Sequence, residues 1–197
     1  AKVTDLYTLK GDGTEIYEPR FTYHGFRFVE VTGYPGHPPL DALEGCVVND
    51  DLESGGAFRC SQPTINRIYQ NIVWGVRGNY RSIPTDCPQR DERQGWLGDR
   101  SAECKGEAFM FRNALLYAKW VQDMVDSQKE NGSVSDVCPA YWPFYNDNVT
   151  WPASLVIVPG MLYEQFGDTA TIARSYDGMV KWIDYMSGFI TDDIMPR

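Results

Sequence analysis

The feature that most constrains the fold is an apolar stripe at helical spacing that begins shortly after residue 60. Six apolar residues fall at positions i, i+3, i+4, i+7, i+8 and i+11, which share one face of an α-helix: Ile65, Ile68, Tyr69, Ile72, Val73 and Val76. Ser61 is placed to cap such a helix, and Pro63 suits its first turn. Gly78 and Pro84 would end it. The pattern predicts a helix over about 61–78, with this stripe buried.

The rest of the chain keeps this helical character. Three more helical stretches are expected, at about 100–129, 153–166 and 169–189. Gly167 and Asp168 separate the last two, as a helix stop followed by a new cap. Pro159 is expected to kink the third stretch or to delay its start.

The first fifty residues have a different character, rich in aromatic and β-branched side chains. Strands are expected at Tyr7–Leu9, within Phe21–Thr32 and at Glu44–Val48. Three or four strands are too few to close a sandwich around a core of their own. The sequence therefore predicts a mainly α chain with an N-terminal β portion, residues 1–52, followed by a helical domain over 53–197.

Charge and cysteine content exclude several classes of function. The formal net charge of −9 would repel a nucleic-acid backbone. No apolar run approaches the roughly 18 residues that a membrane span needs, so neither nucleic acid nor membrane is an expected partner. Five scattered cysteines without a C-x-x-C pair, and only two histidines, argue against a structural zinc site. The cysteines are expected to be buried free thiols, with one or two disulfides as the alternative: Cys46, Cys60, Cys87, Cys104 and Cys138. The sequence leaves the cellular compartment open.

Ionisable side chains are concentrated in the twenty residues 81–100. This stretch holds four carboxylates, Asp86, Asp91, Glu92 and Asp99, and four arginines, Arg81, Arg90, Arg93 and Arg100. Pro88 disfavours a helix at the start of this segment and two glycines interrupt its end, so a structured loop between helices is expected. A solvated charge cluster is the ordinary alternative, but it does not account for Trp96 between two glycines. Loops held by a rigid scaffold often carry catalytic groups.

The same segment resembles a known family signature. The string Asp86-Cys87-Pro88-Gln89-Arg90-Asp91-Glu92-Arg93, followed by Gly95-Trp96-Leu97-Gly98-Asp99, is similar to that of family 78 α-L-rhamnosidases. The flanks at Phe21–Val29, Phe58–Ser61 and Asn66–Asn79 resemble that family too. The resemblance implies a partial (α/α)6 barrel over 53–197, preceded by the last strands of a β-sandwich domain. It also implies inverting hydrolysis of terminal α-L-rhamnosides.

Roles for particular residues follow from the resemblance. It implies Glu92 as the general acid, Asp86 and Asp99 as partners of sugar hydroxyls with Arg90 beside them, and Trp96 as an apolar wall. Trp151 would also line the pocket, although Ala153 stands where the family carries an acidic residue. Trp142, in a long irregular loop at 131–150, is a further candidate for ligand contact. Bare chemistry does not choose between Glu92 and its neighbour Asp91.

The resemblance also implies what lies outside this sequence. An inverting glycosidase needs a second carboxylate as general base, and the family's base is a glutamate beyond Arg197. The expected partners are a rhamnose-containing glycoside or polysaccharide and the remainder of the same polypeptide, with no metal or other cofactor in the chemistry. Two alternatives stay open: a carbohydrate-binding protein without catalysis, and an (α/α)6 glycosidase acting on another sugar.

Overall fold

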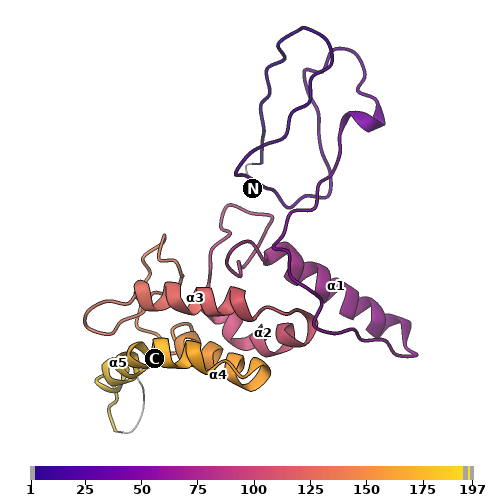
Figure 1. The fold of residues 1–197 in the computed structure, drawn as a ribbon. Helices are drawn as coiled ribbons and strands as arrows, with labels where there is room; N and C mark the ends of the chain where they lie inside the picture. The colour runs from indigo at the N-terminus through magenta and orange to yellow at the C-terminus, as the bar shows by residue number, and fades with distance from the viewer. Residues whose placement is uncertain (1–2, 193–194, 196–197) are drawn as a thin grey trace.

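The structure is a computed structural model that describes residues 3–192 and 195. Within that part of the chain lie one 3-10 turn, η1 (Leu40–Ala42), and five α-helices: α1 (Pro63–Asn79), α2 (Leu97–Met110), α3 (Ala114–Asp126), α4 (Ser154–Phe166) and α5 (Thr169–Ser187). Helices α2 to α5 pack together, α1 projects to one side, and the N-terminal segment stands away from them (Figure 1). None of the described helices has the length and apolar character to cross a bilayer.

The core lies between α4 and the helices around it. Helix α4 packs against α2, α3 and α5, and α3 also packs against α5. Side chains from three helices meet there with 0% exposure: Leu97, Tyr117, Trp120, Met124, Leu155 and Leu162. Burial of an apolar side chain of this size contributes roughly 1.5–3 kcal/mol. This core holds the start of α2, and therefore the residues just before it, in a fixed place.

Helix α1 forms where the apolar stripe predicts it, but the expected burial is wrong for the three isoleucines of the stripe. Val76 is the buried residue of α1 within the described chain. Ile65, Ile68 and Ile72 are 47%, 51% and 47% exposed. The reason is that α2 to α5 lie beyond one end of α1 (Figure 1). The core therefore reaches the stripe only at Val73 and Val76, and the isoleucines stay uncovered in the described chain.

The second predicted helix is two helices rather than one. Helix α2 ends at Met110 and α3 begins at Ala114, with Phe111 in an extended conformation between them. The break is held by residues 53–55: the Gly55 N–H donates to Met110 O at 2.8 Å, and the Arg112 N–H donates to Glu53 O at 2.9 Å. A contact with a distant segment therefore overrides helical propensity at this point.

The junction between the last two helices is confirmed. Gly167 adopts a left-handed conformation with φ of 67°, as a helix-ending glycine does. Asp168 caps α5, because its Oδ1 accepts a hydrogen bond from the Thr171 N–H at 2.9 Å. Pro159 lies buried inside α4, which begins at Ser154, so the proline does not delay the helix start.

The expected strands are absent from the described part of the N-terminal portion. Residues 3–52 run as extended and irregular chain around η1, and the isolated β-bridges of the described residues lie outside this range. Side chains expected on the faces of a strand, such as Phe26 and Phe28, are exposed. A strand requires a neighbouring segment that accepts and donates a series of backbone hydrogen bonds. In the described chain, residues 21–32 make one such backbone contact, from the Gly25 N–H to Pro88 O at 2.8 Å, which is too little for a strand pair.

All five cysteines are free, as predicted, but the expected burial is wrong for Cys46, which is exposed, and for Cys60, which is half-buried. Cys87, Cys104 and Cys138 are buried, and burial raises the pKa of the Cys138 thiol to about 12. These thiols remain protonated near neutral pH and act as small core side chains.

Candidate functional site

The charged segment is a loop between α1 and α2, and it opens onto a cavity of about 210 Å³. Six of the seven residues predicted to form the site line this cavity together: Asp86, Arg90, Glu92, Trp96, Asp99 and Trp151. Trp142 is not among the described residues that line it. The cavity therefore brings together three carboxylates, one guanidinium and two indole rings.

Arg90 bridges two of the carboxylates. Its Nη2 donates to Asp86 Oδ2 at 3.0 Å, and its Nε donates to Glu92 Oε2 at 2.6 Å. The Gln94 N–H donates to the other Asp86 oxygen, Oδ1, at 2.7 Å. The Asp86 side chain is 3% exposed and that of Arg90 is 53% exposed. Protein thus encloses the aspartate, whereas the guanidinium reaches solvent and has room to move.

Trp96 fixes the other oxygen of the central glutamate. Its indole Nε1 donates to Glu92 Oε1 at 2.7 Å. One face of the Trp96 ring stacks on Phe144, with centroids 5.7 Å apart, and Trp142 meets it edge-on at 6.5 Å. Trp142 thus supports the cavity wall through Trp96, a contact that the sequence does not reveal. Its predicted contact with ligand stays a prediction.

Asp99 lies in the first turn of α2, where a helix N-terminus favours negative charge. Although solvent reaches Asp99, partial desolvation raises its pKa above the usual 3.8, and the carboxylates of Asp86 and Glu92 act in the same direction. Arg100 opposes that rise. Asp99 therefore accepts a proton more readily than an ordinary surface aspartate.

Trp151 is seated on Gly98. A Cβ atom at Gly98 would lie 2.6 Å from the Trp151 ring, so only glycine permits this contact. Two residues after Trp151, Ala153 is the N-cap residue of α4, and the hydroxyl of the next residue, Ser154, donates to Leu97 O at 2.7 Å. The start of α4 is thereby tied to the start of α2, and Trp151 is held at the edge of the cavity.

The irregular segment 131–150 lies against the end of the charged loop. The Cys138 N–H donates to Gly95 O, and the Leu97 N–H donates to Asp136 O, both at 2.9 Å. Asp136 is 4% exposed and accepts hydrogen bonds from Asn146 and Asn148. This segment, irregular as expected, therefore builds the wall behind Trp96.

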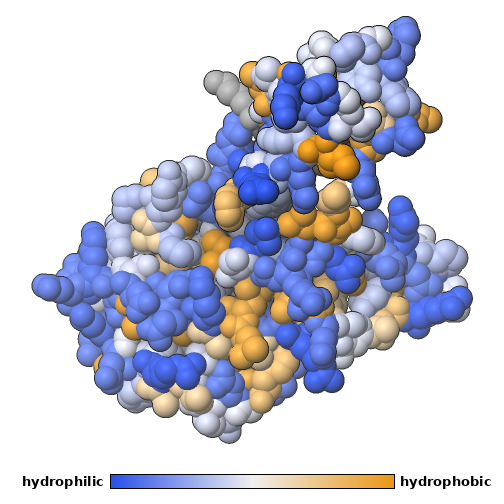
Figure 2. Space-filling view, turned by 45° about the horizontal axis from the view of Figure 1, so that its top comes forward, coloured by the Kyte–Doolittle hydropathy of each residue, from blue (hydrophilic) through white to orange (hydrophobic). Residues whose placement is uncertain are grey.

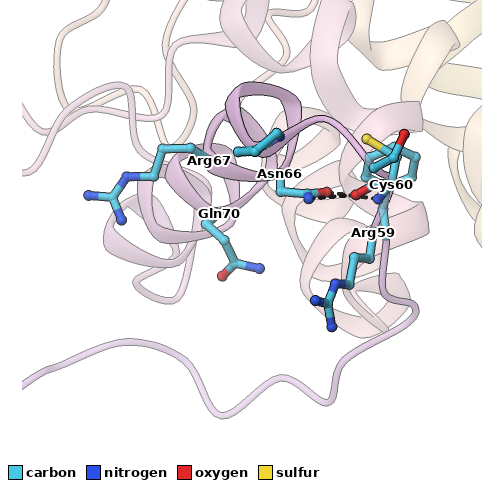
Figure 3. Close-up of a pocket in the computed structure, with 8 residues that line it drawn as sticks. Arg59, Cys60, Asn66, Arg67 and Gln70 are labelled. Carbon is cyan, nitrogen blue, oxygen red and sulfur yellow. Dashed lines mark hydrogen bonds between the residues drawn. The ribbon is translucent and has the colours of Figure 1, made fainter.

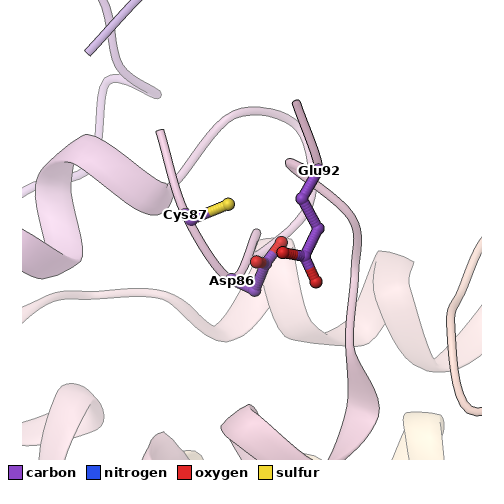
Figure 4. A group of neighbouring side chains, drawn as sticks. All are labelled: Asp86, Cys87 and Glu92. Atoms are coloured by element: carbon purple, nitrogen blue, oxygen red, sulfur yellow. The ribbon is translucent and has the colours of Figure 1, made fainter. Parts of the chain in front are cut away.

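Asp86, Cys87 and Glu92 are close enough to hold one cation, because one ligand atom from each lies within 4.8 Å of the others. Figure 4 shows the two carboxylates side by side, with the thiol on the same loop. However, burial raises the pKa of the Cys87 thiol to about 11, with Asp86 adding to the rise. Arg90 already supplies positive charge to both carboxylates. We therefore assign the cation at this position to Arg90.

A larger hollow of about 650 Å³ lies at the start of α1. Asn66 within it is engaged by the backbone of Cys60, accepting from its N–H at 2.8 Å and donating to its carbonyl at 2.7 Å. Arg59 and Arg67 point in different directions rather than toward a common ligand (Figure 3). The smaller cavity is therefore the better candidate site.

Comparisons with protein families identify the family of this chain. Residues 53–195 match the bacterial α-L-rhamnosidase six-hairpin glycosidase domain, and residues 1–49 match the bacterial α-L-rhamnosidase concanavalin-like domain. An α-L-rhamnosidase from Streptomyces avermitilis is 41% identical over 186 residues, which are 94% of this chain and 18% of that protein. One from Formosa agariphila is 40% identical over 93% of this chain and 20% of its own length.

Solved structures give the same result. The α-L-rhamnosidase from Dictyoglumus thermophilum superposes with a TM-score of 0.88 at 45% identity, covering 92% of this chain and 20% of that one. The S. avermitilis α-L-rhamnosidase complexed with L-rhamnose superposes with a TM-score of 0.91 at 39% identity, covering 96% and 18%. The chain thus spans about a fifth of the length of the relatives it matches.

Proposed function

The chain belongs to the bacterial α-L-rhamnosidase family, and on that premise we propose that the protein hydrolyses terminal α-L-rhamnosides with inversion, using Glu92 as general acid. The observation that carries the proposal is the position of Glu92, which lines the cavity together with Asp86 and Asp99. We propose that these two aspartates hold sugar hydroxyls. Trp96 and Trp151 would form apolar walls beside the sugar.

The proposed chemistry needs a proton on Glu92 and a second carboxylate across the sugar. In inverting glycosidases the acid and the base stand about 6.5–9.5 Å apart, which leaves room for the attacking water. We place the base in a part of the protein outside these 197 residues. Both Glu92 oxygens accept hydrogen bonds, from Trp96 and Arg90. Because Arg90 is half exposed, its movement is the simplest way to free one oxygen for the glycosidic bond.

Substitution of Glu92 in the full-length gene product tests this assignment. Glu92→Gln keeps the shape of the side chain but removes the proton donor, so we expect kcat for an aryl α-L-rhamnoside to fall by roughly 10²–10⁴-fold. The far-ultraviolet circular dichroism spectrum should not change. Turnover within a few-fold of the unmodified protein would remove Glu92 from the role.

Asp91 supplies the matched control. It is exposed and is not among the described residues that line the cavity. Asp91→Asn removes the same charge one position away, and we expect kcat to change less than twofold. A loss in Asp91→Asn with Glu92→Gln active would exchange the two assignments.

Carbohydrate binding without catalysis is the second candidate. It is favoured by the two hydrogen bonds that occupy the Glu92 oxygens, since a binding site needs fixed acceptors rather than a mobile acid. Calorimetry with L-rhamnose, together with a panel of aryl glycosides, separates the cases. Binding of rhamnose without hydrolysis of any glycoside would favour this candidate, and hydrolysis of a different glycoside would change the substrate.

A further inference from the structure

A buried ion pair begins one residue after Asp99, and neither of its members is among the described residues that line the cavity. Arg100 follows Asp99 on α2, and its side chain is 3% exposed. It forms an ion pair with Glu107, two helical turns later, which is 2% exposed. Removal of two charges from water is costly, and such a pair is weak evidence for stability by itself. Its position relative to the cavity suggests another role.

The Arg100 guanidinium reaches the opposite end of the charged loop. Its Nη2 donates to the backbone carbonyl of Thr85 at 2.7 Å. Thr85 immediately precedes Asp86, and its own N–H and hydroxyl both donate to Asn79 O, at 2.8 and 2.9 Å. One side chain, attached to the residue after Asp99, thus holds the residue before Asp86.

Glu107 holds the guanidinium in place. Besides Arg100, it accepts hydrogen bonds from the hydroxyls of Tyr80 and Tyr117. Asn113 in turn donates to the Tyr80 hydroxyl at 3.0 Å. Burial raises the pKa of both phenols, so they remain protonated and act as donors. The arginine is therefore fixed by groups from the end of α1, from α2 and from α3.

From these contacts we infer that Arg100 is a positioning residue, which sets the separation of Asp86 and Asp99 across the cavity. Glu107 holds the Arg100 guanidinium in the orientation that this role requires. The inference rests on the proposed function, in which both aspartates hold sugar hydroxyls. A planar guanidinium can donate to Glu107 and to the Thr85 carbonyl at once. A lysine ammonium keeps the charge but cannot reproduce this fork.

The test compares Arg100→Lys with Glu103→Gln in the full-length gene product. Glu103 is a matched control, because it accepts from Arg100 Nη1 at 2.9 Å but its side chain is 61% exposed. We expect Arg100→Lys to raise KM for an aryl α-L-rhamnoside and Kd for L-rhamnose by roughly tenfold, since small displacements of binding groups weaken positioning strongly. Glu103→Gln should leave both constants within twofold.

Both constants are measured at a temperature at which circular dichroism shows each variant to be fully folded, because a reversibly unfolded fraction would itself raise the apparent KM and Kd. Under that condition a change in the constants reports positioning rather than stability. A lower melting temperature with unchanged KM and Kd would overturn the inference while leaving the proposed function intact. If Arg100→Lys does not fold, Glu107→Gln replaces it; the same rise in both constants is expected, and unchanged constants overturn the inference.

Failure of the proposed function is recognised separately, because then the unmodified protein neither hydrolyses the rhamnoside nor binds L-rhamnose. Amide hydrogen exchange then decides the inference without a ligand. Arg100→Lys should accelerate exchange at residues 85–87 relative to Glu103→Gln. Equal exchange in the two variants would overturn the positioning role.

Discussion

Gly98 carries no side chain because the Trp151 indole occupies the space where a Cβ atom would lie, 2.6 Å from the ring. Gly98→Ala must therefore displace Trp151 or the first turn of α2. We expect kcat/KM of the full-length gene product toward an aryl α-L-rhamnoside to fall by roughly 10- to 100-fold. Steady-state kinetics with the purified variant measures the effect.

Gly106 provides the control on the same helix, since a Cβ atom there would meet nothing within 4 Å. Gly106→Ala should keep normal kinetics and raise the free energy of unfolding by about 1 kcal/mol, because alanine favours a helix over glycine. Equal kinetic losses in both variants would mean that α2 tolerates no change, and that the contact with Trp151 is not the cause.

At the scale of single residues, the sequence identifies most of the groups that meet in the cavity. Asp86, Glu92 and Asp99 lie in a charged segment that also contains Trp96 between two glycines, and this combination is visible in the sequence. The supporting contacts are not. The sequence does not indicate that Phe144 stacks on Trp96, or that Arg100 donates a hydrogen bond to the Thr85 carbonyl. Those contacts join segments that only the fold brings together.

Among the elements, the pairing of residues 95–97 with segment 131–150 depends on one glycine. A Cβ atom at Gly95 would lie 2.0 Å from the Cys138 carbonyl oxygen, which also accepts a hydrogen bond from Trp120 Nε1 at 2.8 Å. We expect Gly95→Ala to lower the free energy of unfolding by about 1–3 kcal/mol, as overpacking of a core does. Urea denaturation followed by tryptophan fluorescence checks this value.

Gly75→Ala on α1 is the comparison, because a Cβ atom there would meet nothing within 4 Å. It should not destabilise the protein. If Gly95→Ala is equally harmless, segment 131–150 is free to move away from the loop, and its role as the wall behind Trp96 is wrong.

Helix positions are predictable from periodicity and caps, as the junction at Gly167 and Asp168 demonstrates. The break at Phe111 is not, because residues 53–55 impose it from more than fifty positions away. Local patterns record the preference of a segment for a helix. They do not record a partner that competes for its backbone hydrogen bonds.

At the scale of the whole molecule, burial likewise depends on distant segments and not on local sequence patterns. The stripe on α1 predicts a helix correctly, yet its isoleucines are exposed, and apolar patches lie open on the surface in Figure 2. The expected strands before residue 50 likewise lie without a pairing partner in the described residues. Periodicity shows which face of a helix or strand is apolar. Whether that face is buried depends on other segments of the polypeptide that pack against it. The domain boundary at residue 52 stays a prediction.

Ile68 on α1 tests whether more of the polypeptide covers this stripe. In a polypeptide of these 197 residues Ile68 is half exposed, so Ile68→Lys should change the free energy of unfolding by less than about 0.5 kcal/mol. In the full-length gene product we expect a loss of roughly 1.5–3 kcal/mol, the contribution of one buried isoleucine. Asn71→Lys, exposed on the same helix, should have little effect in either polypeptide. Denaturant unfolding of the four variants measures the difference, and equal effects of Ile68→Lys in both polypeptides would show that α1 keeps its apolar face open to solvent.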